Sequence, residues 1–264
     1  MSVDYEAAAR ELAGARDDGK PCAPLRGRLL PEGDVTSAYL VQQLQVRQWL
    51  QRGHRRVGAK IGLTSRAVQE SFGVFQPDFG VLTDDMAVAD GAEVPVGRLL
   101  QPRVEAEVAF VLGADLPDER ITGADVIRAV DHVLPAIEIV DSRVAGWDIS
   151  IVDTVADNAS SGLFVLGTTP RRLADVDLRL CGMVLEQAGE PVSVGAGAAC
   201  LGNPLHAVQW LAQTLARSGD PLRAGDVVLS GALGPMVPVT AGAAYEARIS
   251  GLGSVRTCFS KEAS

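Results

Sequence analysis

The sequence predicts an α+β fold with a substantial mixed sheet, and three observations predict it. Two helix-rich segments come first in the chain. From Val57 onward, short runs of Val, Ile and Leu alternate with Gly, Pro and Asp, which is typical of strands and turns. The later helical segments are too few and too unevenly spaced for a β/α barrel. We expect residues 1–55 to form a helical segment packed on a core, and residues 56–264 to form the main domain.

The two N-terminal helices are expected at 4–18 and 35–52. The first ends at Gly19, and the second follows Asp34 as its N-cap and ends at Gly53. The second helix is apolar on two sides: one stripe holds Val35, Ala38, Tyr39, Val46, Trp49 and Leu50, and the other holds Leu40, Val41 and Leu44. Because a helix that is apolar on two sides usually packs twice, we expect a homo-oligomer.

The main domain alternates strands with a few helices. Strands are expected at 56–61, 103–112, 134–141, 162–167, 178–187, 226–230 and, in pieces, 244–259. Helices are expected at 64–72, 123–132 and 203–218, and the last begins with Asn203 as N-cap and Pro204 in the first turn. We expect a turn at 76–80, and a loop of small residues at 156–162 whose hydroxyl and N–H groups could bind an anion.

The charge of the chain excludes some classes of partner. The 264 residues include 24 Lys and Arg and 33 Asp and Glu, which gives a net charge of −9. This excess argues against binding to nucleic acid or to an anionic membrane. The four cysteines form no C-x-x-C pair, and no signal-peptide pattern is visible at the N-terminus, so we expect a cytoplasmic protein with reduced thiols. A small anionic substrate would need a local positive charge.

Three carboxylates are the candidates to hold that charge. In the strand at 103–112, Glu105 and Glu107 lie on the same face because side chains alternate with period two. Glu138 lies in an otherwise apolar strand, where an isolated carboxylate is costly. Three carboxylates without cysteine or histidine favour Mg²⁺ or Mn²⁺ over Zn²⁺. The same spacing also fits a solvated sheet face with Glu138 paired to an arginine, and the residues alone leave both interpretations open.

Lys60 is the second kind of candidate. It is a single cation in an apolar, glycine-flanked strand, and a buried lysine can act as an acid or a base. The alternative is a surface lysine whose ammonium group reaches the solvent.

Six segments together resemble the fumarylacetoacetate hydrolase superfamily, and most closely its 2-oxopent-4-enoate (2-hydroxypenta-2,4-dienoate) hydratases. They are GAKIGLTS (58–65), QPDFGVL (76–82), LLQPRVEAEVAFVL (99–112), VLPAIEIVDSR (133–143), VDTVADNASSG (152–162) and LRAGDVVLSGALGPMVPV (222–239). The resemblance implies a mixed β-roll with surrounding helices, and a catalytic domain of the fumarylacetoacetate hydrolase type over 56–264.

The resemblance also implies a function and a set of site residues. The metal ligands would be Glu105, Glu107 and Glu138, with Mg²⁺ or Mn²⁺ as the cofactor. Lys60 and Asp78 would move protons. The substrate-binding residues would be Ser160, Ser161, Gly231 and Leu233.

The implied reaction is the addition of water to a small anionic 2-hydroxydienoate in the meta-cleavage catabolism of aromatic compounds, with an aldolase as a possible partner. Asp78 and the loop SGALGPMV favour the hydratase. A 2-oxo-3-hexenedioate (4-oxalocrotonate) decarboxylase is the first alternative, and a non-enzymatic binding module, which would hold no metal, is the second.

Overall fold

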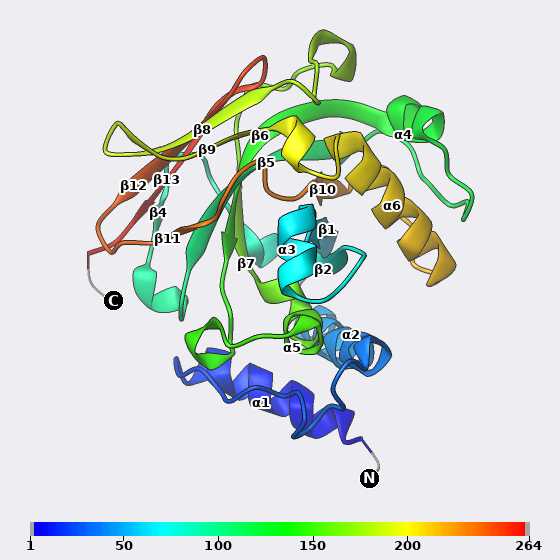
Figure 1. The fold of residues 1–264 in the computed structure, drawn as a ribbon, viewed down its shortest axis with the longest axis vertical. Coiled ribbons are helices and arrows are strands. Elements are labelled where there is room, and N and C mark those ends of the chain that lie inside the picture. Colours follow the sequence, from blue (N-terminus) through cyan, green and yellow to red (C-terminus); the bar gives the residue numbers. More distant parts are fainter. Residues whose placement is uncertain (1–2, 262–264) are drawn as a thin grey trace.

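The computed structural model describes residues 3–261 and contains both helices and sheets, as expected for an α+β fold (Figure 1). Its α-helices are α1 (Tyr5–Asp17), α2 (Val35–Gln51), α3 (Arg66–Ser71), α4 (Gly123–Ala129), α5 (Ile151–Ala156) and α6 (Pro204–Arg217). Among the described residues, no helix is both long and apolar enough to cross a membrane.

The larger sheet is mixed and carries the long strands. Its order is β2-β1-β10-β5-β6-β7-β3, with β11 paired to β5. These strands are β1 (Arg56–Gly62), β2 (Asp78–Thr83), β3 (Ala87–Val88), β5 (Arg103–Leu112), β6 (Val130–Val140), β7 (Ser161–Leu166), β10 (Val227–Leu229) and β11 (Val237–Pro238). Only the β1–β10 and β3–β7 pairs of this sheet are parallel. The curled, mixed sheet is the β-roll that the resemblance implied.

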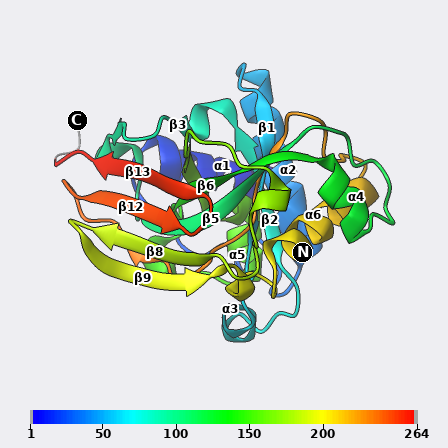
Figure 2. The ribbon, with the colours of Figure 1, turned by 90° about the horizontal axis from the view of Figure 1, so that it is seen from above.

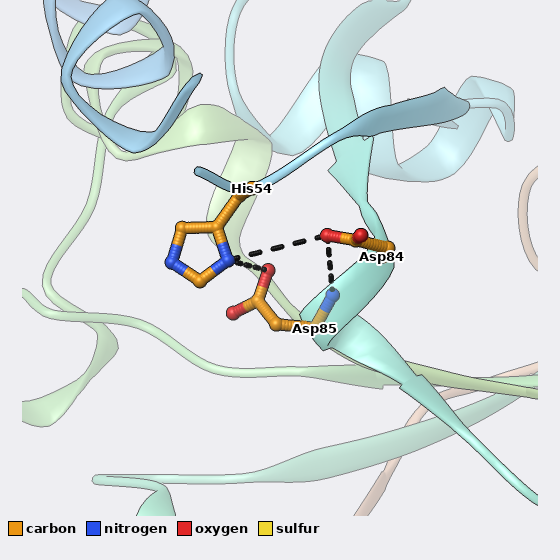
Figure 3. Close-up of side chains that lie close together, drawn as sticks. All are labelled: His54, Asp84 and Asp85. Carbon is orange, nitrogen blue, oxygen red and sulfur yellow. Dashed lines mark hydrogen bonds and ion pairs between the residues drawn. The ribbon is translucent and has the colours of Figure 1, made fainter. Parts of the chain in front are cut away.

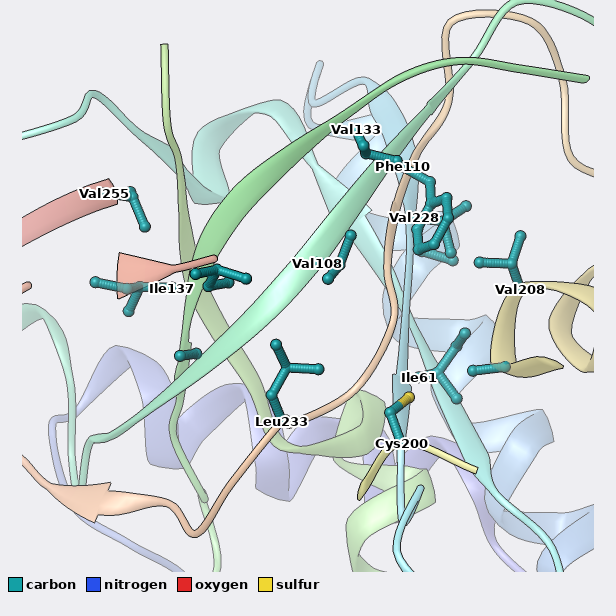
Figure 4. Packing of buried hydrophobic residues seen from close by; sticks show 14 of the residues in the cluster. Ile61, Val108, Phe110, Val133, Ile137, Cys200, Val208, Val228, Leu233 and Val255 are labelled. Carbon is teal, nitrogen blue, oxygen red and sulfur yellow. The ribbon is translucent and has the colours of Figure 1, made fainter. Parts of the chain in front are cut away.

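A second sheet packs against β5 and β6 and completes the main core (Figure 2). Its order is β4-β13-β12-β8-β9, formed by β4 (Glu93–Val94), β8 (Gly182–Gln187), β9 (Glu190–Ala196), β12 (Ala244–Ile249) and β13 (Gly253–Phe259). The main core lies between the two sheets and beneath α4 and α6. It includes Val108, Phe110 and Ile137, which are fully buried and drawn in Figure 4.

The N-terminal helices form a second core with α5. Ala8, Leu12, Ala38, Val41 and Val155 belong to this cluster, which lies at the lower end of Figure 1. Of the two apolar sides predicted for α2, Leu40 and Leu50 are about two-fifths exposed within the single chain. The buried face of this helix instead includes two glutamines, Gln42 and Gln45. The predicted limits of α1, α2 and α6 agree with the structure to within one residue, and so do the N-caps Asp34 and Asn203 predicted for α2 and α6.

Several expected elements need correction. The segment at 76–80 is not only a turn, because β2 begins at Asp78. The helix expected at 123–132 ends at Ala129, and β6 begins at the next residue. The strand expected at 178–187 begins only at Gly182. Helix α5 and strand β9 were missed, since β-branched residues mask the helix and Pro191 and Gly195 interrupt the strand pattern.

Candidate metal centre

Strand pairing brings the three predicted carboxylates together. In the antiparallel β5–β6 pair, Glu105 lies directly opposite Glu138, and Glu107 follows two residues along β5 on the same face. A carboxylate oxygen from each of the three lies within 4.8 Å of the others. Glu107 and Glu138 are buried, with exposed fractions of 0% and 1%, and Glu105 is partly buried. The cluster is therefore not a solvated sheet face.

Three oxygens of this cluster have no hydrogen-bond partner, and one of them, Oε1 of Glu138, has only the ion pair with Lys60. Oε1 of Glu107 and both carboxylate oxygens of Glu138 are buried without a hydrogen-bond partner. Oε2 of Glu107 accepts a hydrogen bond of 2.8 Å from the backbone N–H of Gly231. A buried carboxylate without donors is strongly disfavoured unless a cation compensates its charge. These orphaned oxygens fit a divalent cation, which binds such hard oxygen ligands.

Mutual repulsion and burial change the acidity of these groups. Burial, reinforced by the charge of Glu138, raises the pKa of Glu105 to about 7. Burial and the charges of Glu138 and Glu105 raise the pKa of Glu107 well above its ordinary value. In the absence of a cation, the cluster therefore retains protons at a pH where ordinary carboxylates have lost them.

Lys60 on β1 reaches the same cluster. Its Nζ atom lies 3.1 Å from Oε1 of Glu138, and the residue is only 3% exposed, so it is not a surface lysine. Burial lowers the pKa of Lys60, but the negative charges of Glu138 and Asp78 outweigh this effect and raise the pKa above its ordinary value. The lysine is therefore held as a cation beside one of the candidate metal ligands.

Asp78 lies beside Lys60, at the first position of β2. The β1–β2 pairing places it opposite Gly62. A Cβ atom on Gly62 would lie 2.2 Å from Oδ1 of Asp78 and 3.6 Å from Nζ of Lys60, so both charged groups lie next to this glycine. Oδ1 of Asp78 is buried without a hydrogen-bond partner. Burial, partly opposed by Lys60, raises the pKa of Asp78 to about 6, so this carboxyl group can gain and lose a proton near neutral pH.

The loop with Gly231 and Leu233 supports the cluster from the side of β10. Gly231 has a φ of +101°, and a Cβ atom there would lie 2.4 Å from the side chain of Thr64. Its N–H group is used by Glu107. The N–H of Leu233 donates to the carbonyl of Ala106, and its side chain is fully buried in the main core (Figure 4).

Ser160 and Ser161 lie in an unusual turn between α5 and β7. Asn158, Ala159 and Ser160 all have φ between 52° and 53°, a left-handed conformation that costs energy for residues other than glycine. Oγ of Ser160 lies 3.2 Å from Oγ1 of Thr154, and Oγ of Ser161 donates a hydrogen bond of 2.7 Å to the carbonyl of Asn158. Both serines are buried, and these contacts connect their hydroxyls to α5 and to the turn itself.

Sequence reasoning missed the residue that holds this turn. Arg143 is 2% exposed and forms an ion pair with Asp157, in which Nε lies 2.5 Å from Oδ1. Its Nη groups donate to the backbone carbonyls of Asp157 and Ser161. A signal was present, because Arg143 lies only three residues after Val140, the last residue of the apolar run that carries Glu138, and a buried cation needs a partner.

A second group of possible metal ligands lies at the surface (Figure 3). Nδ1 of His54 lies 3.3 Å from an oxygen of Asp85 and 4.0 Å from an oxygen of Asp84. These carboxylates already accept hydrogen bonds from Thr83 and from the backbone N–H of Arg55. The group thus differs from the buried cluster, in which three carboxylate oxygens have no hydrogen-bond partner.

Comparison with known proteins agrees with this geometry. The family model described as fumarylacetoacetate (FAA) hydrolase C-terminal matches residues 50–260. The chain belongs to this family. The 2-keto-4-pentenoate hydratase 2 of Dechloromonas aromatica is 58% identical over 96% of this chain and 97% of its own length.

Two further members have similar coverage. The 2-keto-4-pentenoate hydratase of Paraburkholderia xenovorans is 56% identical over 96% of this chain and 94% of its own length. Among solved structures, the 4-oxalocrotonate decarboxylase of Pseudomonas putida G7, complexed with magnesium and adipate, matches with a TM-score of 0.92 and 37% identity. It covers 98% of this chain and 99% of its own. The fumarylacetoacetate hydrolase fold predicted for this chain is thereby confirmed.

Proposed function

We propose that the protein is a hydro-lyase, a metal-dependent hydratase that adds water to 2-hydroxypenta-2,4-dienoate, the enol form of 2-oxopent-4-enoate. The observation that carries the proposal is the convergence of three carboxylates, Lys60 and Asp78 in one buried site. The names of the relatives at 56% to 58% identity support the choice of substrate.

Glu105, Glu107 and Glu138 would hold Mg²⁺ or Mn²⁺. When bound, the ion would act as a Lewis acid toward the oxygens of the substrate's C1 carboxylate and C2. The ion would also explain how an acidic protein attracts a small anion, because it supplies the local positive charge that the net charge of −9 lacks.

Lys60 and Asp78 would transfer the protons of the reaction. The dienol first takes a proton at C5 and loses the proton of its C2 hydroxyl group, which gives a conjugated ketone. Water then adds its oxygen at C4 and a proton at C3, and the product is 4-hydroxy-2-oxopentanoate. Asp78 Oδ1 and Lys60 Nζ flank the same space above Gly62, so a proton can be exchanged between this pair and the substrate there.

Ser160 and Ser161 would bind the substrate carboxylate. The hydroxyl group of Ser160 would donate to it directly, whereas that of Ser161 would first have to leave the carbonyl of Asn158. Gly231 and Leu233 would shape the side of the site next to β10. Gly231 would do so by positioning Glu107, and Leu233 by fixing the loop to β5. The four unpaired cysteines fit a reducing compartment, and we propose that the protein works in the cytoplasm as a homo-oligomer, with an aldolase as the consumer of its product.

A direct comparison of substrates tests this function. The protein should remove the ultraviolet absorbance of enzymatically generated 2-hydroxypenta-2,4-dienoate and form 4-hydroxy-2-oxopentanoate. Treatment with EDTA should abolish this activity, and Mg²⁺ or Mn²⁺ should restore it. Release of CO₂ from 2-oxo-3-hexenedioate, with little hydration of the dienoate, would instead assign the decarboxylase activity named for the structural relative. Absence of both activities and of metal binding would indicate a binding module.

A further inference from the structure

Helix α2 places a buried glutamine next to β2, the strand that begins with Asp78. Gln42 is 2% exposed, and its Nε2 group donates one hydrogen bond of 2.9 Å to the carbonyl of Phe79 and another of 3.2 Å to the carbonyl of Val155. Phe79 directly follows Asp78 in β2. One side chain therefore connects the strand that begins with Asp78 to helix α5.

The same helix contacts Phe79 a second time. The ring of Tyr39 stacks on the ring of Phe79, with 4.7 Å between the centroids and 21° between the planes. Tyr39 and Gln42 are three residues apart and share a face of α2. Both the ring and the carbonyl of the residue after Asp78 are therefore fixed by α2.

At α5, glutamines of α2 satisfy the carbonyls at the end of the helix. The last carbonyls of a helix lack partners within the helix. Gln42 donates to Val155, and Gln45 donates a hydrogen bond of 2.6 Å to the carbonyl of Ala156. The chain continues from Ala156 directly into the turn with Ser160.

The turn at Asn158–Ser160 is also fixed to β2. The side-chain oxygen of Asn158 accepts a hydrogen bond of 2.8 Å from the N–H of Val81, and its Nδ2 group donates one of 2.9 Å to the carbonyl of the same residue. The turn also approaches Gly80 so closely that a Cβ atom there would lie 2.3 Å from the carbonyl oxygen of Asn158. Strand β2 is thus held between α2 and this turn.

We infer that Gln42 is a positioning residue for the reaction, which holds Asp78 opposite Gly62 and near Lys60 and fixes β2 relative to the serine turn. Most of α2 precedes residue 50, where the match to the family model begins. The N-terminal helical segment would therefore contribute to the active site. The kinetic part of this inference rests on the proposed hydratase function, whereas its structural part does not.

Three substitutions of glutamine in α2 by methionine separate positioning from stability. Gln42→Met keeps the size of the side chain and removes both hydrogen bonds. Gln45→Met removes only the bond to α5, and Gln43→Met changes an exposed residue as the control. Each variant is measured for kcat and KM with the dienoate, for Mn²⁺ affinity by calorimetry, and for hydrogen–deuterium exchange of peptides that cover 78–83 and 157–161.

Gln42→Met should lower kcat by about 10-fold to 100-fold, because small displacements of a catalytic group are costly. Its Mn²⁺ affinity should stay within about twofold of wild type, since the ligands lie on β5 and β6, and exchange should accelerate in both peptides. Gln45→Met should raise KM with a much smaller change in kcat and accelerate exchange only in 157–161. Gln43→Met should behave as wild type.

An unchanged kcat in Gln42→Met, or equal losses of kcat in Gln42→Met and Gln45→Met, would overturn the inference. If Gln42→Met does not fold, Gln42→Asn provides the same comparison, because its shorter amide cannot bridge both carbonyls. If the wild-type protein shows no hydratase activity, the proposed function fails. The rate of hydrogen–deuterium exchange in the peptide 78–83 then tests whether Gln42 positions β2. An unchanged exchange rate in the Gln42 variant would refute that positioning.

Discussion

The Nζ atom of Lys60 lies 3.1 Å from Oε1 of Glu138, and neither residue is more than 3% exposed. This ion pair does not balance the site, because Glu105, Glu107 and Asp78 also act on Lys60, and a second cation, Arg103, acts on Glu105. One lysine thus faces several carboxylates. The remaining negative charge favours the binding of a divalent cation and keeps the lysine protonated.

Replacement of Lys60 by alanine tests its part in proton transfer. We expect Lys60→Ala to bind Mn²⁺ still, since Lys60 is not a ligand, while turnover of the dienoate falls by about 10²-fold or more, the usual effect of losing an acid or base. Calorimetry with Mn²⁺ and the absorbance assay measure the two properties. Near-normal turnover would remove Lys60 from the mechanism.

Replacement of Glu107 by glutamine tests the metal ligands. Glu107→Gln should lose most of its metal affinity, because an amide is a weaker ligand than a carboxylate. The metal-free variant should melt at or above the temperature of metal-free wild type at pH 8, because the change removes one of several mutually repelling buried charges, and the amide oxygen can still accept from Gly231. Calorimetry and thermal melting measure these effects, and an unchanged metal titration would refute the assignment.

Stability of the metal-free protein should depend on pH in a defined direction. The pKa values of Glu105 and Asp78 in the folded protein, about 7 and about 6, lie above those of the unfolded chain, about 4. The folded state therefore binds more protons, so this contribution to the free energy of unfolding is present below pH 4 and is lost as the pH rises towards 7.

Thermal melting in EDTA and in Mn²⁺ between pH 5 and pH 8 measures this dependence. Because the metal binds the deprotonated carboxylates, the difference in Tm between the two series should increase with pH. A difference that is constant or decreases over this range would contradict the assigned shifts.

Replacement of Gly62 by alanine tests the space between Lys60 and Asp78. The new Cβ atom would lie 2.2 Å from Oδ1 of Asp78, so the carboxylate has to move. We expect turnover to fall by at least about 10-fold, whereas Mn²⁺ affinity stays close to that of wild type. Gly123→Ala is the matched control, because its Cβ would meet only a side-chain atom of Gln209 at 3.7 Å. Equal kinetics in both variants would show that Asp78 tolerates displacement.

The sequence predicted the elements whose signal is local. Period-two alternation located Glu105 and Glu107 on one face of a strand, and Asn203 with Pro204 marked the start of α6. The pairing of Glu105 with Glu138 could not be read from the sequence, because the register between two strands is a tertiary property. The motif resemblance implied that Glu105, Glu107 and Glu138 share one metal ion, but it did not give the strand pairing.

The missed features depend on polar groups in buried positions. Gln42 and Gln45 were overlooked because the buried sides of this helix were predicted from its apolar residues alone. These two amides are buried because they donate to backbone carbonyls of neighbouring elements. Helix α5 had a visible signal, since Ser150 and Asp153 form a capping box at its start. The left-handed turn at Asn158 had no such signal, because it depends on contacts with β2 and Arg143.

The parallel pairing of β1 with β10 has a consequence for refolding. Arg56 and Asp226, which bind each other beside this pair, are 170 residues apart in the chain, and Glu107 and Gly231 are 124 apart. Contacts over such distances form slowly. The three candidate ligands lie on the adjacent strands β5 and β6, but their surroundings also need Lys60 from β1 and the N–H of Gly231 after β10. The site is therefore complete only after most of the chain has folded, so added Mn²⁺ should slow unfolding strongly and change the refolding rate little.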